Sequence, residues 1–159
     1  MSAIRQIQID RFGTAETLGL SEIAAASSIG QDEVQIAVNY SGINFADIQM
    51  RLGFYPDAPK KPFVPGYEVS GIVEKIGPAV THVNVGEHVV AGTYFGGYAS
   101  QVTVPGHQVF PLPQSMSLAE GAALPVNFFT AHLALFEMAR IRAGDRVLIE
   151  SATGGVGTM

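Results

Sequence analysis

The 159-residue sequence contains no cysteine. Without cysteine the chain can form no disulfide bond and offers no thiolate to a metal, which excludes a disulfide-stapled fold and every cysteine-based zinc site. The absence is compatible with a reducing cytosol.

Long apolar runs and a surplus of basic residues are also missing. No apolar run approaches the roughly 18 residues that a membrane span needs, and the first residues lack the basic leader and apolar core of a secretory signal. The 9 Lys and Arg residues against 14 Asp and Glu give a net charge of -5, which argues against binding nucleic acid through its phosphates. We therefore expect a soluble, cytoplasmic protein with no membrane span and no nucleic-acid partner.

What is abundant is apolar residues, 47% of the chain, and glycine, with 18 residues beside 9 prolines. This composition is typical of a globular domain with many tight turns, hence a β-rich one. Residues 33–40 alternate polar and apolar with a period of two, which predicts a strand buried on one face. Strands are expected at residues 4–9, 16–23, 33–40, 67–76, 85–92 (a turn and a strand) and 96–105, and residues 109–113 are expected to lead out of the sheet. Their spacing favours a small barrel or sandwich.

Helical signals separate and follow these strands. Asn44 can cap a helix that Gly53 ends, and the proline-rich residues 54–66 then form an irregular loop. Ser117 and Glu120 form a capping box for a short helix. Pro125 can begin a further helix with a wide apolar face, and we expect a domain boundary near Leu124.

The last stretch predicts a strand at residues 147–150, a glycine-rich turn at residues 152–157 (ATGGVG) and the start of a helix. This order is typical of a dinucleotide-binding fingerprint, in which the glycines let the backbone approach a pyrophosphate. A plain strand-to-helix turn is the alternative. The acidic or basic residue that distinguishes NAD from NADP is expected about 20 residues further on, beyond Met159. We expect the chain to be the N-terminal part of a longer protein.

Four stretches together resemble the medium-chain dehydrogenase/reductase superfamily, and within it the zinc-independent quinone oxidoreductase branch, which includes zeta-crystallin and VAT-1-like proteins. The resemblance covers essentially the whole chain; Thr153, where the pattern has a smaller residue, is a tolerated departure. The stretches are residues 42–47 (GINFAD) with 51–56 (RLGFYP), 62–73 (PFVPGYEVSGIV), 85–89 (VGEHV), and 144–148 (GDRVL) with 152–157 (ATGGVG).

The resemblance implies a mainly β fold. Residues 1–124 would be a GroES-like β-barrel catalytic domain. Residues 125–159 would be the first helix, strand and glycine-rich turn of a truncated Rossmann dinucleotide-binding domain. The full-length protein is expected to be a homodimer, and the 159-residue chain alone is expected to be inactive.

The resemblance also argues against a metal. The positions of the two Cys and one His that bind catalytic zinc in other members fall on Asn44, Tyr67 and Val126, and none of these is a plausible zinc ligand. The four histidines are scattered singly along the chain. We expect no metal site.

Without a Lewis acid, the expected chemistry is hydride transfer from NADPH, or NADH, to a quinone or an α,β-unsaturated carbonyl, where hydrogen-bond donors stabilise the charge on the carbonyl oxygen. By resemblance the catalytic residues are Asn44, Tyr55 and Tyr67. The expected cofactor-binding residues are Asn44, Asp47, Thr130, Gly154, Gly155, Val156 and Gly157.

Each of these residues also has an ordinary structural role open to it. Asn44 can simply cap its helix, Asp47, expected to orient its neighbours, can instead be a solvated or capping carboxylate, and Thr130 can be a helix residue with no function. Tyr55 can be an exposed loop residue and Tyr67 a packed strand residue. Three phenylalanines are candidates to wall a flat substrate, with core packing preferred for at least two of them: Phe54, Phe95 and Phe128.

Two other functions stay open on the same fold. One is a non-catalytic binding or structural protein like VAT-1 or the crystallins, and the other is an acyl-thioester enoyl reductase module. The intact glycine-rich turn favours an active enzyme, because a purely structural protein needs no phosphate-binding turn.

Overall fold

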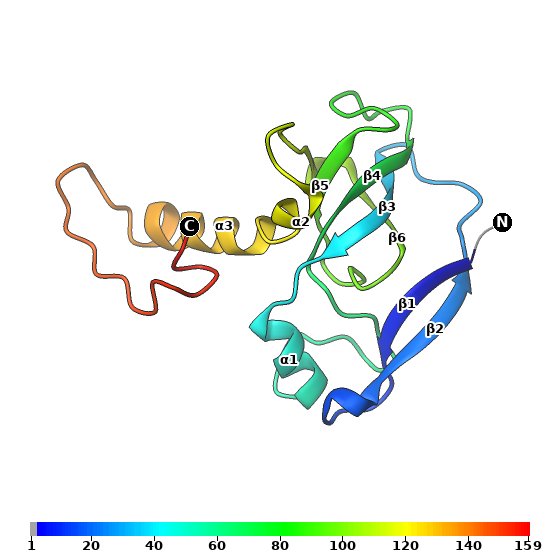
Figure 1. The fold of residues 1–159 in the computed structure, drawn as a ribbon, viewed down its shortest axis with the longest axis horizontal. Coiled ribbons are helices and arrows are strands. Elements are labelled where there is room, and N and C mark those ends of the chain that lie inside the picture. Colours follow the sequence, from blue (N-terminus) through cyan, green and yellow to red (C-terminus); the bar gives the residue numbers. More distant parts are fainter. Residues whose placement is uncertain (1–2) are drawn as a thin grey trace.

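A curled antiparallel sheet forms the body of the molecule in this computed structural model, which describes residues 3–159 (Figure 1). The sheet has five strands in the order β6-β3-β4-β5-β7. Their bounds are β3 (Glu33–Ser41), β4 (Glu68–Ile76), β5 (His88–Gly92), β6 (Gln101–Pro105) and β7 (Val109–Pro111). A β-rich fold that curls into a half-barrel confirms the expected fold class.

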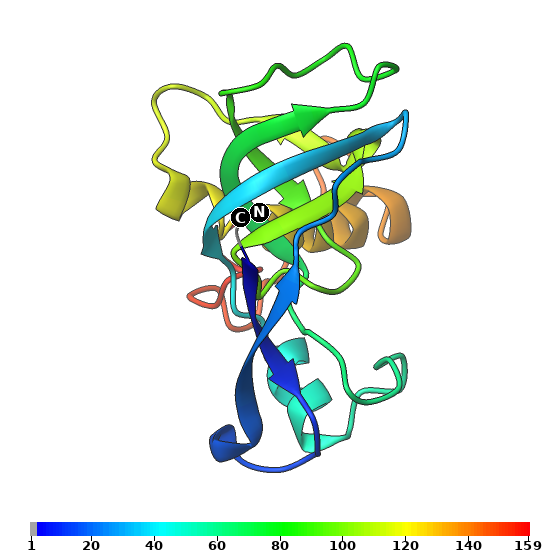
Figure 2. The same cartoon turned by 90° about the vertical axis from the view of Figure 1, so that its right-hand side faces the viewer.

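A separate hairpin, β1 (Ala3–Ile9) and β2 (Leu18–Ala24), stands beside the sheet with the short helix η1 (Ala15–Thr17) in its connection (Figure 2). It is joined to the body by backbone hydrogen bonds, including Ile7 N–H to the Tyr98 carbonyl at 2.8 Å and Ile9 N–H to the Phe63 carbonyl at 2.8 Å. These bonds hold the hairpin against the loops that connect the sheet strands.

The strands form because their alternating valines and isoleucines meet inside the curled sheet. The main core is a cluster of buried residues, and burying side chains of this kind is the dominant stabilising contribution in folding. Its members are Val34, Ile36, Val69, Val73, Val80, Val83, Val89, Ala91, Val102, Val104 and Val109. A second small cluster of Ile9, Met50 and Phe63 fixes the first helix against the hairpin.

The helices lie at the ends of the sheet. Helix α1 (Phe45–Leu52) follows β3 and ends at Gly53, which has the positive φ of 83° that favours glycine. Helix α2 (Leu118–Gly121) begins with the expected Ser117–Glu120 capping box. After the 3-10 turn η2 (Gly106–Gln108) and β7, helices α2 and α3 (Pro125–His132) carry the chain away from the sheet, and the π-helical turn η3 (Leu133–Met138) extends α3 (Figure 1).

The strand predicted at residues 147–150 does not form, and that prediction is wrong for this structure. A strand is stabilised by hydrogen bonds to a neighbouring strand, and no described strand lies beside this segment. Val147, Leu148 and Ile149 are instead 47%, 86% and 51% exposed. The glycine-rich stretch forms turns, with no helix after it in residues 3–159, and the segment returns beside α3 (Figure 1).

None of the helices within residues 3–159 combines the length and the apolar character required to cross a bilayer.

Candidate functional site

Asn44 stands at the junction between β3 and α1, as the N-terminal capping residue of the helix. Its backbone N–H donates to Asp47 Oδ2 at 2.8 Å, and its side-chain Nδ2 donates to Glu68 Oε1 at 2.8 Å. The segment ahead of it is equally constrained, because Gly42 N–H donates to the Glu68 carbonyl at 3.2 Å. Both the backbone and the amide of Asn44 therefore have fixed partners.

Asp47 is only 5% exposed, and its carboxylate accepts hydrogen bonds from three directions. Oδ1 accepts from Gly66 N–H at 3.1 Å, and Oδ2 accepts from Asn44 N–H and from the Tyr98 hydroxyl at 3.1 Å. Burial raises the pKa of the Asp47 carboxyl, and these hydrogen bonds oppose the rise. Since its oxygens are used inside the chain, Asp47 is placed to orient its neighbours.

Glu68, the first residue of β4, is 1% exposed and joins the two halves of the site. Its Oε1 holds the Asn44 amide, and its Oε2 accepts from the Val126 N–H in the first turn of α3 at 2.8 Å. Burial raises the pKa of the Glu68 carboxyl, while the hydrogen bonds from Val126 and Asn44 act in the opposite direction. Buried carboxylates are costly unless hydrogen-bonded, and Glu68 meets that condition with one donor on each oxygen.

Tyr67 and Tyr55 lie next to this network in a group of aromatic rings. The Tyr67 ring centroid is 6.3 Å from that of Tyr55 and 5.5 Å from that of Phe95. Burial raises the pKa of the Tyr67 hydroxyl, and the neighbouring Tyr55 adds to the rise. A phenol ionises only near pH 10, so the Tyr67 hydroxyl is protonated at neutral pH with or without this rise and can donate a hydrogen bond.

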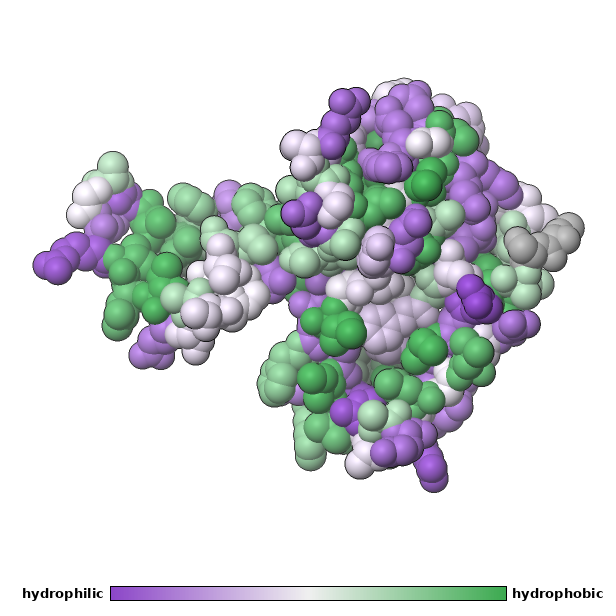
Figure 3. Space-filling view, in the orientation of Figure 1, coloured by the Kyte–Doolittle hydropathy of each residue, from purple (hydrophilic) through white to green (hydrophobic). Residues whose placement is uncertain are grey.

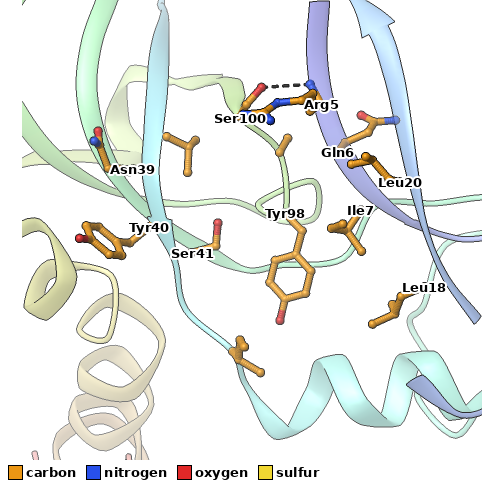
Figure 4. A pocket seen from close by; sticks show the side chains of 13 residues that line it. Arg5, Gln6, Ile7, Leu18, Leu20, Asn39, Tyr40, Ser41, Tyr98 and Ser100 are labelled. Atoms are coloured by element: carbon orange, nitrogen blue, oxygen red, sulfur yellow. Dashed lines mark hydrogen bonds between the residues drawn. The ribbon is translucent and has the colours of Figure 1, made fainter. Parts of the chain in front are cut away.

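Two hollows open on either side of the network. One, of about 330 Å³, is lined by residues of the sheet and α3: Tyr67, Gly92, Thr93, Tyr94, His107, Gln108, Phe110 and Phe129. The other, of about 580 Å³, lies between the β1–β2 hairpin and β3, with the Tyr98 ring near its centre (Figure 4). Tyr98 connects this groove to the network because its hydroxyl donates to Asp47.

Apart from Asn44 and Asp47, the residues expected to bind the cofactor lie on and beside α3. Thr130 is exposed on this helix. The glycine-rich turn packs against it, since a Cβ on Gly155 would come within 2.6 Å of Asn127 Oδ1. Within residues 3–159 the N–H groups of Gly155, Val156 and Gly157 have no recorded acceptor. Close packing and free N–H groups fit a bound phosphate, although the helix that normally follows such a turn is absent from this part of the chain.

The structure thus brings Asn44, Asp47, Tyr55 and Tyr67 together, with Thr130 and the glycine-rich turn at the far side of α3. Sequence reasoning missed Glu68 and Tyr98. The available signal for Glu68 was a carboxylate at the head of a central strand, where a buried charge is costly without partners. Nothing in the sequence pattern distinguished Tyr98.

The phenylalanines differ from expectation. Core packing was preferred for at least two of Phe54, Phe95 and Phe128, but Phe54 is 75% exposed and Phe128 is 49% exposed. Only Phe95 packs into the second core cluster. The preference was wrong because Phe54 lies in the irregular loop after α1, and Phe128 lies on the helix that leaves the sheet.

Two of the three positions that the resemblance aligns with zinc ligands of other members meet at Glu68. Asn44 and Val126 both donate to the Glu68 carboxylate, and Tyr67 is its neighbour in the chain. Within residues 3–159, no group of three His, Cys, Asp or Glu side chains is arranged to hold a metal ion.

The sequence also matches a known domain family. The sequence model of the alcohol dehydrogenase GroES-like domain matches residues 30–114. The chain belongs to this GroES-like domain family. Its relatives are VAT-1-like proteins and quinone oxidoreductases of the medium-chain dehydrogenase/reductase superfamily, which confirms the resemblance seen in the sequence.

Three relatives of this GroES-like protein illustrate the match. The mouse synaptic vesicle membrane protein VAT-1 homolog-like is 41% identical over 97% of this chain and 37% of its own length. The rat quinone oxidoreductase is 37% identical over 97% of this chain and 47% of its own length. The Escherichia coli quinone oxidoreductase complexed with NADPH superposes with a TM-score of 0.85 and 31% identity, over 96% of this chain and 47% of that one.

The chain therefore spans about half or less of the length of the relatives that it matches. The division into residues 1–124 and 125–159 stays a prediction.

Proposed function

We propose that this chain is the catalytic part of an NAD(P)H-dependent oxidoreductase that transfers a hydride to a quinone or an α,β-unsaturated carbonyl without zinc. The observation that carries the proposal is that Asn44 and Val126, at two of the positions aligned with zinc ligands, both donate to the Glu68 carboxylate. Where zinc-dependent members of the superfamily have metal ligands, this chain has an amide, a phenol and an aliphatic residue. The similarity to quinone oxidoreductases supports the same conclusion.

The residues present suit the charge that such a reaction develops. When bound, a reduced nicotinamide supplies the hydride. As a hydride reaches the conjugated carbon, negative charge appears on the carbonyl oxygen, and donors placed there lower the barrier. The Tyr67 hydroxyl, protonated at neutral pH as any phenol is, is one donor, and Tyr55, whose ring centroid lies 6.3 Å from that of Tyr67, is the second. A proton then completes the reduction, giving a hydroquinone or a saturated carbonyl.

Asn44 has one further N–H on Nδ2, which suits a substrate carbonyl, since an amide has two N–H donors. Its Oδ1 faces the Asp47 backbone N–H in the capping box, and the second lone pair of this oxygen suits the carboxamide of a nicotinamide. Asp47 orients Asn44 through its backbone N–H. Thr130 and the N–H groups of Gly155, Val156 and Gly157 would hold the cofactor from the side of α3.

The hollow of about 330 Å³ is the proposed substrate site, and of the three proposed catalytic residues Tyr67 lines it, while Asn44 and Tyr55 lie outside its lining. Four aromatic side chains contribute to its walls: Tyr67, Tyr94, Phe110 and Phe129. Flat, apolar, conjugated carbonyl compounds match walls of this kind. We propose a small-molecule substrate of this class, and a homodimer for the full-length protein stays a prediction.

The test uses the full-length gene product. NADPH or NADH absorbance is followed with a simple quinone, a simple enone and an enoyl thioester, and Tyr67→Phe is compared with the native protein. Oxidation of one cofactor with the quinone or enone, reduced in Tyr67→Phe, is the expected result. No turnover with any acceptor and no cofactor-induced thermal shift would contradict the proposal.

One observation favours a second candidate. The 41% identity to a VAT-1 homolog-like protein leaves room for a non-catalytic binding protein on the same fold. Cofactor binding without turnover on any of the three acceptors would support this candidate. Faster turnover of the enoyl thioester than of free enones would instead indicate an enoyl reductase.

A further inference from the structure

We propose that Glu68 is a positioning residue that sets the orientation of the Asn44 amide and ties it to the start of α3. In this role Glu68 fixes the substrate end of the site relative to the cofactor end. The inference rests on the function proposed above for Asn44 and α3. It concerns a residue that touches neither substrate nor cofactor.

The hydrogen bonds around Glu68 support this role directly. The carboxylate is 1% exposed, so water does not compete for it. Each oxygen accepts one hydrogen bond at 2.8 Å, from Asn44 Nδ2 on one side and Val126 N–H on the other. A single rigid group thus bridges the segment before α1 and the first turn of α3, which are 82 residues apart in sequence (44 to 126).

Gly42 supplies the space for this bridge. A Cβ on Gly42 would lie 2.2 Å from Glu68 Oε1 and 2.6 Å from the Ala122 carbonyl oxygen. Heavy atoms that are not bonded cannot approach so closely, so any side chain at this position would displace the carboxylate. Three segments therefore meet at Glu68: the backbone around Gly42, strand β4 and the link between α2 and α3.

Glu68 and Asp47 divide the work of holding Asn44. Asp47 accepts from its backbone N–H and fixes where the residue begins α1. Glu68 accepts from Nδ2 and so determines that Nδ2, and not Oδ1, faces its carboxylate. A half-turn of the amide would bring Oδ1 against Oε1, two acceptors with no proton between them. Removing the charge on Glu68 should therefore release the amide without moving the helix.

Glu68→Gln tests this. The glutamine keeps the size of the side chain but has only one acceptor, and the Val126 N–H is a donor that cannot turn. We expect the glutamine oxygen to stay with Val126 and its NH₂ group to face Asn44, whose amide then turns so that Oδ1 accepts. Nuclear magnetic resonance on the 159-residue chain should show shifted, faster-exchanging Asn44 side-chain NH₂ signals and an unchanged Val126 amide.

Turnover in the full-length protein provides the second readout. A misplacement of about 1 Å in an active site costs roughly 100-fold in rate, so we expect Glu68→Gln to lower kcat by roughly 10- to 100-fold. Cofactor affinity should change little, because α3 keeps its contact. The matched control is Glu74→Gln, the same change on the exposed part of β4 where Glu74 pairs with Gln101; it should leave kcat unchanged.

The outcomes separate the inference from the proposed function. An inactive native protein would contradict the function, whereas the Asn44 signals test the positioning role independently of turnover. Unchanged Asn44 signals in Glu68→Gln, or an unchanged kcat, would overturn the inference. If Glu68→Gln does not fold, the double variant Glu68→Gln with Asn44→Asp restores an acceptor opposite the glutamine. It should fold with a native Val126 amide but remain slow; full activity would overturn the inference.

Discussion

Asp47 and Glu68 place two carboxylates where water hardly reaches, 5% and 1% exposed. Desolvation makes such groups costly, and their hydrogen bonds offset that cost. Asp47 receives three donors and Glu68 two. At the scale of single residues, the site is therefore held together by two buried carboxylates whose hydrogen-bond donors all come from the chain itself.

Replacing Asp47 should show this dependence. In Asp47→Asn one acceptor oxygen becomes a donor, so a hydrogen bond from Gly66 N–H, or those from Asn44 N–H and Tyr98, must be lost. We expect the free energy of unfolding to fall by about 1–3 kcal/mol, the cost of an unsatisfied buried polar group. Urea denaturation measures it. Asp57→Asn, in the exposed loop after α1, is the control; an equal loss in both variants would contradict the network.

The raised pKa of Glu68 should make its contribution to the free energy of unfolding fall as the pH rises. Burial raises the pKa of this carboxyl above its ordinary value of 4.5, so between the two values the folded state binds more protons than the unfolded state. The contribution of Glu68 to stability is then full below pH 4.5 and declines as the pH rises through the folded pKa. The difference in unfolding free energy between native protein and Glu68→Gln should decrease over that range.

Glu87→Gln provides the opposite case. Hydrogen bonds from Asn84 lower the pKa of the Glu87 carboxyl, so its contribution is present above the ordinary value and is lost as the pH falls. Parallel slopes for the Glu68 and Glu87 variants would contradict the assignment of the two shifts.

At the scale of elements, the sequence predicts most of the fold because its signals are local. The period of two at residues 33–40 becomes β3, and Asn44 and Gly53 bound α1 as expected. The same reasoning failed at residues 147–150, because a short apolar run becomes a strand only beside a partner strand. Pairing is a property of the surroundings, which no local pattern contains.

The end of α1 offers a matched pair of glycines. Gly53 has a φ of 83°, and a Cβ there would lie 2.7 Å from the Phe12 ring; Gly86 has a φ of 89° with nothing within 4 Å. In both Gly→Ala variants the free energy of unfolding should fall by about 1–2 kcal/mol, because alanine is strained in the left-handed conformation. Gly53→Ala should lose more, because its methyl group also meets Phe12. Thermal unfolding compares the two, and equal losses would show that Phe12 moves aside freely.

At the scale of the whole molecule, the site depends on segments far apart in sequence. Asn44, Asp47, Tyr55 and Tyr67 were predicted as site residues from their motifs, and the structure places them side by side. Glu68 was not predicted, because its partners Asn44 and Val126 are chosen by the packing of α3 on the sheet. The cofactor end was predicted from the glycine-rich turn, from the strand and helix expected around it and from the family resemblance; that strand and helix do not form in the described residues.

The part of the molecule beyond the sheet carries a large apolar surface (Figure 3). It combines exposed side chains of α3 and η3 with those of the segment that returns beside them: Phe128, Phe129, Leu133, Phe136, Met138, Val147, Leu148 and Ile149. Contiguous apolar surface of this kind associates with other apolar surfaces in water. The 159-residue chain should therefore bind a hydrophobic dye and self-associate as its concentration rises.

Adding charge to this surface tests the expectation. In the double variant Phe136→Asp with Leu148→Asp, both altered side chains are already exposed, by 51% and 86%, so the sheet core is untouched. We expect weaker dye fluorescence and, in sedimentation experiments, a lower weight-average molecular mass at the same concentration. Val85→Asp, at a 61% exposed turn of the sheet, adds charge elsewhere and should change neither. If both variants reduce association equally, net charge and not the α3 surface governs it, because only the first variant removes apolar area from that surface.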